Sequence, residues 1–275
     1  IVSYKKDDEF HLTEKGRAQA ESAASKLKEG VDVIIASPLL RTKETAEIIA
    51  KKLGIDASAI VYDDRIAEVN TGDFNGCSIE TYRAYFSSTL EKFEKPCPNG
   101  ETLGEMKRRI GEFVYDIDER YKGARILIVA HEYTAWLLDA VAHGATNEEA
   151  AAMRELLGED YIDNAEVRKL DFAPITHNDA YELDFHRPYV DRIVYHCSCE
   201  LGRMERIKEV FDCWFESGSM PFAQFHYMGD ERTPEGKLFM KNFPADFIAE
   251  AVDQTRGWFY TMLILSVALF DRAAF

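Results

Sequence analysis

Three widely separated residues, Arg41, Glu68 and His131, are of types that could together bind and process a phosphate group. A guanidinium holds a phosphate dianion through a bidentate fork, and a helix start adds unpaired backbone N–H groups. A His at a strand end can donate to the same anion, and a loop Glu can act as general acid or base. A solvated Arg, a structural His and an exposed Glu are the more common interpretations, so residue types alone leave both possibilities open.

The predicted secondary structure places these residues at one edge of a sheet. Val31–Ala36 and Ala124–Ala130 are short apolar runs typical of buried strands, and Arg41 and His131 follow them. Helices are expected from the N-cap Thr13 toward Gly30, over Arg41–Leu53, over 101–122 and over Thr134–Ala142. This alternation predicts an α/β fold with a largely parallel sheet, in which ligands bind beyond the carboxyl ends of the strands.

Length, composition and charge limit the kinds of protein that this chain can be. The 275 residues leave room for about two domains, and 46% hydrophobic content allows a sizeable core. The formal net charge of −16 disfavours nonspecific binding of this chain to nucleic-acid backbones. Five cysteines at irregular spacing indicate reduced thiols rather than a disulfide framework.

Targeting segments are not expected. The chain begins at Ile1 without a secretory pattern, and both ends look like cuts in a longer protein. The longest apolar run, Trp258–Phe270, is shorter than the roughly 20 residues of a membrane span. We therefore expect a buried helix there and no membrane partner.

A second group of residues near the C-terminus could support adenylyl transfer. Trp214 and Trp258 can form flat apolar walls, and Glu250, Asp253 and Gln254 can accept hydrogen bonds from an α-ammonium and a ribose. Core tryptophans and a solvated helix start are the ordinary alternative. Residue types alone do not decide between these interpretations.

The elements around this second group are less regular. After a connector near residues 172–178, Phe211–Phe215 is predicted as a strand and Phe247–Ala251 as a short buried segment. A long helix is predicted from Gln254 to the end of the chain. Cys197-Ser198-Cys199 lacks the usual Cys-x-x-Cys spacing of structural zinc sites, so zinc is not expected.

The segments Leu12–Ala20, Ser37–Ala46 and Val129–His131 resemble the histidine phosphatase superfamily over about residues 8–172. The resemblance implies a histidine-phosphatase-like α/β/α sandwich over residues 1–173. It also implies that Arg41 binds the phosphate of a small molecule, His131 completes the pocket and Glu68 protonates the leaving group.

Two departures from that family affect the expected activity. The Arg-His-Gly motif, whose His accepts the phosphoryl group, is absent from the sequence, and His11 is a poor substitute. Glu132 stands where Gly is usual, and a carboxylate 4 Å from a dianion repels it by about 1 kcal/mol in water. We expect weakened or altered phosphatase activity, and no phosphohistidine formed by this chain alone.

The segments Glu182–Asp191, Trp214–Gln224 and Pro244–Tyr260 resemble isoleucyl-tRNA synthetases over about residues 176–275. The resemblance implies that residues 174–275 belong to the Rossmann-type catalytic domain of a class I synthetase. One departure is Ala251, where Gly is usual.

The resemblance also assigns roles. Glu250 contacts the aminoacyl-adenylate, Trp214 and Trp258 border the isoleucine pocket, and Asp253 and Gln254 line the site. The implied parent is a cytoplasmic isoleucine–tRNA ligase that uses isoleucine, tRNA(Ile) and ATP with Mg²⁺.

The two ATP-phosphate signatures of these synthetases, His-Ile-Gly-His and Lys-Met-Ser-Lys-Ser, are absent, so this chain alone is not expected to activate isoleucine. The alternatives are a phosphatase that works through a phosphohistidine and a noncatalytic phosphate-binding module.

Overall fold

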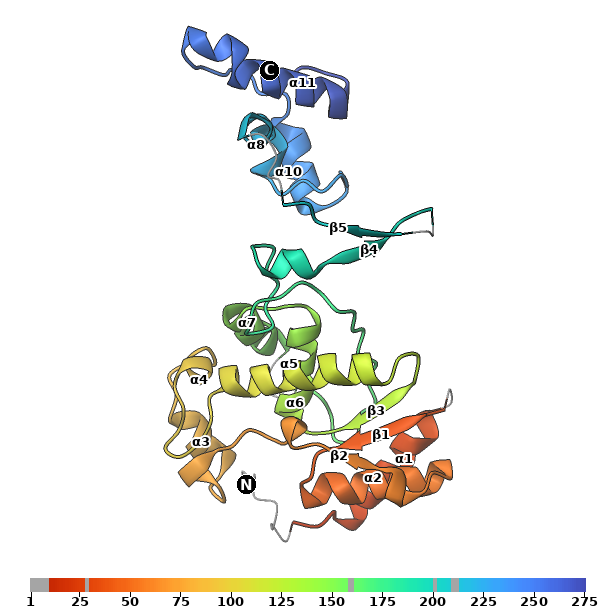
Figure 1. The fold of residues 1–275 in the computed structure, drawn as a ribbon. Coiled ribbons are helices and arrows are strands. Elements are labelled where there is room, and N and C mark those ends of the chain that lie inside the picture. The colour runs from red at the N-terminus through yellow and green to blue at the C-terminus, as the bar shows by residue number, and fades with distance from the viewer. Residues whose placement is uncertain (1–9, 28–29, 158–160, 200–201, 209–212) are drawn as a thin grey trace. The chain divides into compact units, whose positions relative to one another are not determined.

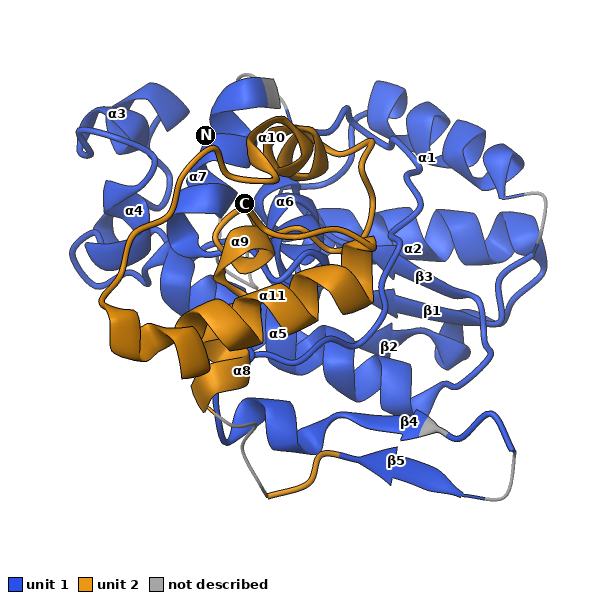
Figure 2. Cartoon of the chain, turned by 90° about the horizontal axis from the view of Figure 1, so that it is seen from above, with its two compact units in different colours: residues 1–205 blue, residues 206–275 orange. Residues whose placement is uncertain are grey.

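The computed structural model describes residues 10–27, 30–157, 161–199, 202–208 and 213–275 (Figure 1). The chain divides into two compact units, Ile1–Glu205 and Arg206–Phe275, shown in separate colours in Figure 2. Each unit has its own hydrophobic core and is described by itself.

Unit 1 is built on a three-stranded parallel sheet of order β2-β1-β3. Its strands are β1 (Val33–Ala36), β2 (Val61–Tyr62) and β3 (Ile126–Val129). Because β1 pairs with both neighbours, the ends of β1 and β3 lie side by side, with Ala36 in register with Val129. The predicted parallel α/β sheet is confirmed.

Helices cover both faces of this sheet. Ile34 and Ala36 point to one face and pack against α1 (Glu14–Lys26) and α2 (Leu40–Leu53). Ile35 points to the other face, because side chains alternate along a strand, and joins the larger core under α5 (Leu103–Arg120) and α6 (Glu132–Ala142). The result is the predicted three-layer sandwich (Figure 1).

Local sequence signals explain several helix ends. The Thr13 hydroxyl accepts from the Gly16 N–H and begins α1, as predicted. Gly54 ends α2 in the left-handed region at φ 73°, where a residue without Cβ is favoured. Thr102 and Glu105 form a capping box at the start of α5.

Unit 1 also contains short elements between the main ones. Its remaining α-helices are α3 (Ile79–Ala84), α4 (Glu91–Glu94) and α7 (Asn147–Leu157). Its 3₁₀ turns are η1 (Ala57–Ala59), η2 (Asp64–Ile66), η3 (Gly72–Phe74) and η4 (Tyr189–Arg192). The strands β4 (Val194–His196) and β5 (Arg203–Glu205) pair antiparallel as a hairpin.

The segment after Ala173 packs on α5. Lys107, whose side chain is 1% exposed, forms an ion pair with Glu182 at 3.0 Å and also donates to Asn147. The Tyr115 hydroxyl donates to the carbonyl of Ile175 and accepts its N–H. These bonds attach the connector to unit 1.

Unit 2 is helical in the part that the structure describes. Its elements are α8 (Cys213–Gly218), α9 (Met220–Ala223), α10 (Pro234–Asn242), the 3₁₀ turn η5 (Val252–Arg256) and α11 (Trp258–Phe270). Phe239, Phe243, Met262 and Ala274 form its buried core.

Four predictions for unit 2 are wrong in part. The apolar run Trp258–Phe270 is a helix, but it is not the buried helix expected, because Met262 and Ser266 are its buried residues and Ile264 and Leu269 are at least half exposed. The proposed strand Phe211–Phe215 is helical from Cys213 onward, and residues 211–212 lie outside the described residues. Phe247 is 81% exposed, so its segment is not buried. The long helix begins at Trp258, because Gly257 at φ −118° and ψ −112° separates it from η5, and it ends at Phe270.

Among the described residues, no helix combines the length and the apolar character needed to cross a lipid bilayer.

Candidate functional site

Arg41 and His131 meet at the carboxyl edge of the sheet, although they are 90 residues apart. Arg41 lies in the first turn of α2, which follows β1, and His131 is the N-cap of α6, which follows β3. An Arg41 Nη2–H donates to His131 Nδ1 at 3.1 Å, and His131 Nε2 lies 2.7 Å from the hydroxyl of the buried Ser37. Strand pairing thus brings together a cation, an imidazole, a hydroxyl and two helix N-termini, all groups that favour an anion.

The hydrogen bonds define the protonation state of His131. A guanidinium can only donate, so Nδ1 must accept and the imidazole proton lies on Nε2, directed at Ser37. Burial, together with the positive charges of Arg41 and Arg109, lowers the pKa of His131 well below its usual range. The ring is therefore neutral near pH 7 and presents an N–H donor without a charge.

Glu68 lies in the loop after η2, and charge interactions link its carboxyl to Arg41 and Glu132. Desolvation is the main cause that raises the pKa of this carboxyl to about 7, and the charge of Glu132 adds to the increase. The Val69 N–H, which donates to Oε1 at 2.9 Å, and the charges of Arg41 and Arg109 oppose it. A carboxyl that titrates near neutrality can exchange protons in either direction.

Arg109 fixes the loop that carries Glu68. Its guanidinium donates to the carbonyls of Arg65, Ala67 and Glu68 and forms an ion pair with Glu101 at 2.7 Å. The Glu101 carboxylate in turn accepts from the N–H of Asn70. The role of Arg109 leaves no local signal in the sequence, because inside α5 it looks like any cation of an amphipathic helix.

Glu132 has a compensating partner that the sequence analysis missed. Its carboxylate forms an ion pair with Arg154 of α7 and accepts from the Tyr161 N–H at 3.2 Å. Arg154 also lies over the Tyr133 and Trp136 rings, at 5.4 and 5.6 Å from the centroids. The repulsion expected between Glu132 and a dianion is therefore reduced by a neighbouring cation.

His11 lies in a different environment. Its side chain is 63% exposed and pairs with Glu44 of α2, which also accepts from the Leu12 N–H.

In unit 2 the structure brings together Trp214, Gln254 and Trp258. The Gln254 Oε1 accepts the Trp258 N–H at 3.1 Å and caps the start of α11. The Trp258 indole donates to the Ser217 carbonyl at 3.0 Å. The Trp214 ring packs on Gly257, where an added Cβ would lie 3.1 Å from it.

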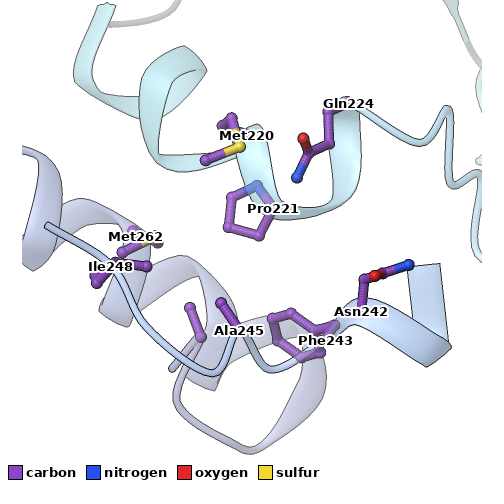
Figure 3. A pocket seen from close by; sticks show the side chains of 9 residues that line it. Met220, Pro221, Gln224, Asn242, Phe243, Ala245, Ile248 and Met262 are labelled. Atoms are coloured by element: carbon purple, nitrogen blue, oxygen red, sulfur yellow. The ribbon is translucent and has the colours of Figure 1, made fainter.

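The two acidic residues lie on the surface. Glu250 and Asp253 are exposed, and Asp253 is 3.4 Å from the Gln254 amide. A cavity of about 50 Å³ in unit 2 is lined by other residues, among them Met220, Gln224, Phe243 and Met262 (Figure 3). Four of the five predicted residues lie on the stretch 250–258, and Trp214 of α8 packs against it at Gly257, but none of the five lines this cavity.

Metal ligands are not grouped in the described ranges. No set of three or more His, Cys, Asp or Glu side chains there is arranged to hold a metal ion.

The three-layer sandwich and the strand-end cluster, formed by Ser37, Arg41 and His131, define a class of protein. Residues 2–176 match the family model of the histidine phosphatase superfamily (branch 1), and the chain belongs to this family. A mycobacterial glucosyl-3-phosphoglycerate phosphatase of known structure is 22% identical, with a TM-score of 0.48 over 56% of this chain and 76% of that one.

The C-terminal part has different relatives. Residues 153–275 match the class I tRNA synthetase family for I, L, M and V. This part is 54% identical over 94 residues to isoleucine–tRNA ligase of Clostridium kluyveri, and 51% identical over 111 residues to the cytoplasmic enzyme of Caenorhabditis elegans. These matches cover 34% and 40% of this chain, and each spans 9% of the relative. Both resemblances predicted from the sequence are confirmed.

Proposed function

We propose that the chain is a segment of an isoleucine–tRNA ligase that carries a histidine-phosphatase-like module. This proposal rests on a sequence identity of 50% or more to proteins named isoleucine–tRNA ligase. The matching family model by itself does not specify the amino acid, because it covers the enzymes for I, L, M and V. We place the boundary of the two modules near residues 173 and 174. The whole protein would act in the cytoplasm on isoleucine, tRNA(Ile) and ATP, with Mg²⁺ entering on the ATP phosphates.

Physical chemistry supports the roles of the C-terminal residues. Gln254 and the Ser217 carbonyl hold Trp258 in one orientation, so its indole can serve as a fixed apolar wall. Glu250 and Asp253 keep exposed carboxylates on the same short stretch, where they can accept from an α-ammonium or a ribose. Positioning and charge stabilisation of this kind are what adenylyl transfer requires.

Isoleucine-dependent ATP–pyrophosphate exchange by the full-length protein tests this proposal. We expect exchange with isoleucine well above that with leucine. Glu250→Gln should lower kcat/KM by roughly tenfold or more, equivalent to about 1.4 kcal/mol. Glu235→Gln, an exposed acid on α10, is the matched control and should leave the exchange unchanged. Absence of exchange with isoleucine would refute the ligase assignment.

A second function is favoured by the strand-end cluster of unit 1. We propose that Arg41, His131 and Ser37 bind the phosphate of a small phosphorylated ligand, next to Glu68. The hydrogen bonds that link the first three residues and the near-neutral pKa of Glu68 support this proposal. Binding without turnover corresponds to the noncatalytic alternative, whereas transfer through a phosphohistidine corresponds to the phosphatase alternative.

Calorimetric titration with sulfate tests the anion site, because sulfate stays a dianion across the pH range used. Arg41→Ala should weaken binding by roughly 10- to 100-fold, since a hydrogen bond to a charged group contributes about 1.5–3 kcal/mol. Lys51→Ala, in the last turn of the same helix, should bind sulfate like the parent chain. Equal affinity in all three chains would rule out the site.

A phosphatase assay with p-nitrophenyl phosphate separates the two alternatives. We expect sulfate binding with little turnover. Robust turnover that is lost in His131→Ala would instead support the phosphatase alternative.

A further inference from the structure

The β4–β5 hairpin carries two cysteines, separated only by Ser198, at the point where its ladder ends. His196 pairs with Arg203, and the Cys197 N–H then donates to the Gly202 carbonyl at 3.0 Å, which closes the loop. Cys199 is exposed and Cys197 is half-buried, so reagents in solution can reach the pair.

The two sulfur atoms lie unusually close for thiols that form no disulfide bond. Cys199 Sγ is 2.9 Å from Cys197 Sγ, and both residues are reduced. A disulfide requires about 2.05 Å between the sulfurs and a Cα separation of about 4.4–6.8 Å. The two sulfur atoms therefore have to approach each other by less than about 1 Å for the bond to form.

The other cysteines provide a contrast. Cys97 is 2% exposed, and burial raises the pKa of its thiol, so it is a poor nucleophile. Cys213 is exposed, like Cys199, but begins α8 in unit 2. No second cysteine lies within ten residues of Cys213 along the chain, so a mixed disulfide there has no resolving thiol in its own segment.

We propose that Cys197 and Cys199 form a thiol-oxidation site, which low-molecular-weight disulfides such as glutathione disulfide convert into an intrachain disulfide. The Cys199 thiolate attacks one sulfur of glutathione disulfide and expels one glutathione thiolate, which leaves a mixed disulfide. The Cys197 thiolate then attacks Cys199 Sγ and expels the second glutathione. The cysteine pair loses two electrons and two protons, and one glutathione disulfide is reduced to two glutathiones.

Disulfide formation needs two thiols, and the pair supplies both. Zinc in structural sites takes four protein ligands, and this pair supplies two. In the described part of the chain, these thiols do not belong to any set of three or more potential ligands. Since exposed disulfides are readily reduced again, the oxidised hairpin should be a reversible state.

Peptide mapping of the whole chain tests the proposal. Trypsin cleavage after Arg192 and Arg203 releases both cysteines in one peptide, 193–203, whereas Cys213 lies in another. After equilibration in glutathione redox buffers and alkylation, the 193–203 peptide should lose two hydrogen masses and resist alkylation. Half-conversion should need at least tenfold less glutathione disulfide than half-modification of Cys213, because the second thiol is present at a high effective concentration.

Two variants and one measurement serve as controls. Cys199→Ser should abolish the mass loss, and Cys213→Ser should leave it unchanged. A 193–203 peptide that carries glutathione without closing the bond would overturn the proposal. Stoichiometric zinc in the purified chain that protects both thiols from alkylation would overturn it too.

Discussion

Arg41 and His131 are hydrogen-bonded across 90 residues of sequence, whereas Gln254 and Trp258 are hydrogen-bonded across four. In unit 1, paired strands carry the site residues to one edge, bury them and shift their pKa values. In unit 2, all the proposed residues except Trp214 lie along the stretch 250–258, and its acids are exposed. Pairing of distant strands therefore buries the site residues of unit 1 in the protein interior, whereas Glu250 and Asp253 of unit 2 remain exposed to solvent.

The largest expected effect among the tests of this comparison is on stability, in a variant of Glu68. Its pKa is about 7 in the folded chain and near 4.5 in an unfolded one. The folded state therefore retains a proton that the unfolded state loses, so this carboxyl lowers stability as the pH rises from about 4.5 through 7. Glu68→Gln removes the titration and should make unit 1 more stable than the parent at pH 8 by on the order of 2 kcal/mol, after allowance for partial exposure.

Urea unfolding at pH 5 and pH 8 measures this difference. In a background of Trp214→Phe and Trp258→Phe, the buried Trp136 of α6 is the remaining tryptophan and reports on unit 1. Parallel pH dependence of the parent and Glu68→Gln chains would show that burial does not raise this pKa.

A smaller effect is expected in unit 2. Trp258→Phe deletes the indole N–H that donates to the Ser217 carbonyl and should destabilise unit 2 by about 1 kcal/mol. Trp214→Phe should cost less, because that side chain is 43% exposed. Near-ultraviolet circular dichroism during thermal unfolding can rank the two variants, and the reverse order would contradict the local arrangement.

The smallest effect is expected at Glu132. Because Arg154 and the Tyr161 N–H already compensate its carboxylate, Glu132→Gln should strengthen sulfate binding less than threefold. Calorimetry at low ionic strength, where charge effects are largest, is the suitable measurement. A gain above tenfold would mean that the carboxylate repels the anion despite its partners.

The sequence predicted most of unit 1 because its signals are local and consistent. Thr13, the apolar run before Ser37 and Gly54 mark an N-cap, a buried strand and a C-cap, and the structure has all three. Strand-end topology then placed Arg41 and His131 near each other. The partners Arg109 and Arg154 could not be predicted, since their roles arise from tertiary contacts that leave no local pattern.

In unit 2, short apolar runs led to wrong predictions of secondary structure and burial. Cys213–Phe215 reads as a strand by its aromatic content, yet it forms the start of a six-residue helix. Phe247 looks like core and is exposed. Short apolar runs do not distinguish strand from helix, and their burial depends on what packs against them.

The buried ammonium of Lys107 determines where this polypeptide can be trimmed. Removal of everything after Ala173 would take away Glu182 and leave that charge without its carboxylate inside the protein. Loss of one partner from a buried ion pair costs about 3–5 kcal/mol, a large share of the stability of a small domain. A fragment that stops at Glu205 should therefore melt at a clearly higher temperature than one that stops at Ala173, and biochemists who want the anion pocket alone should choose the longer fragment.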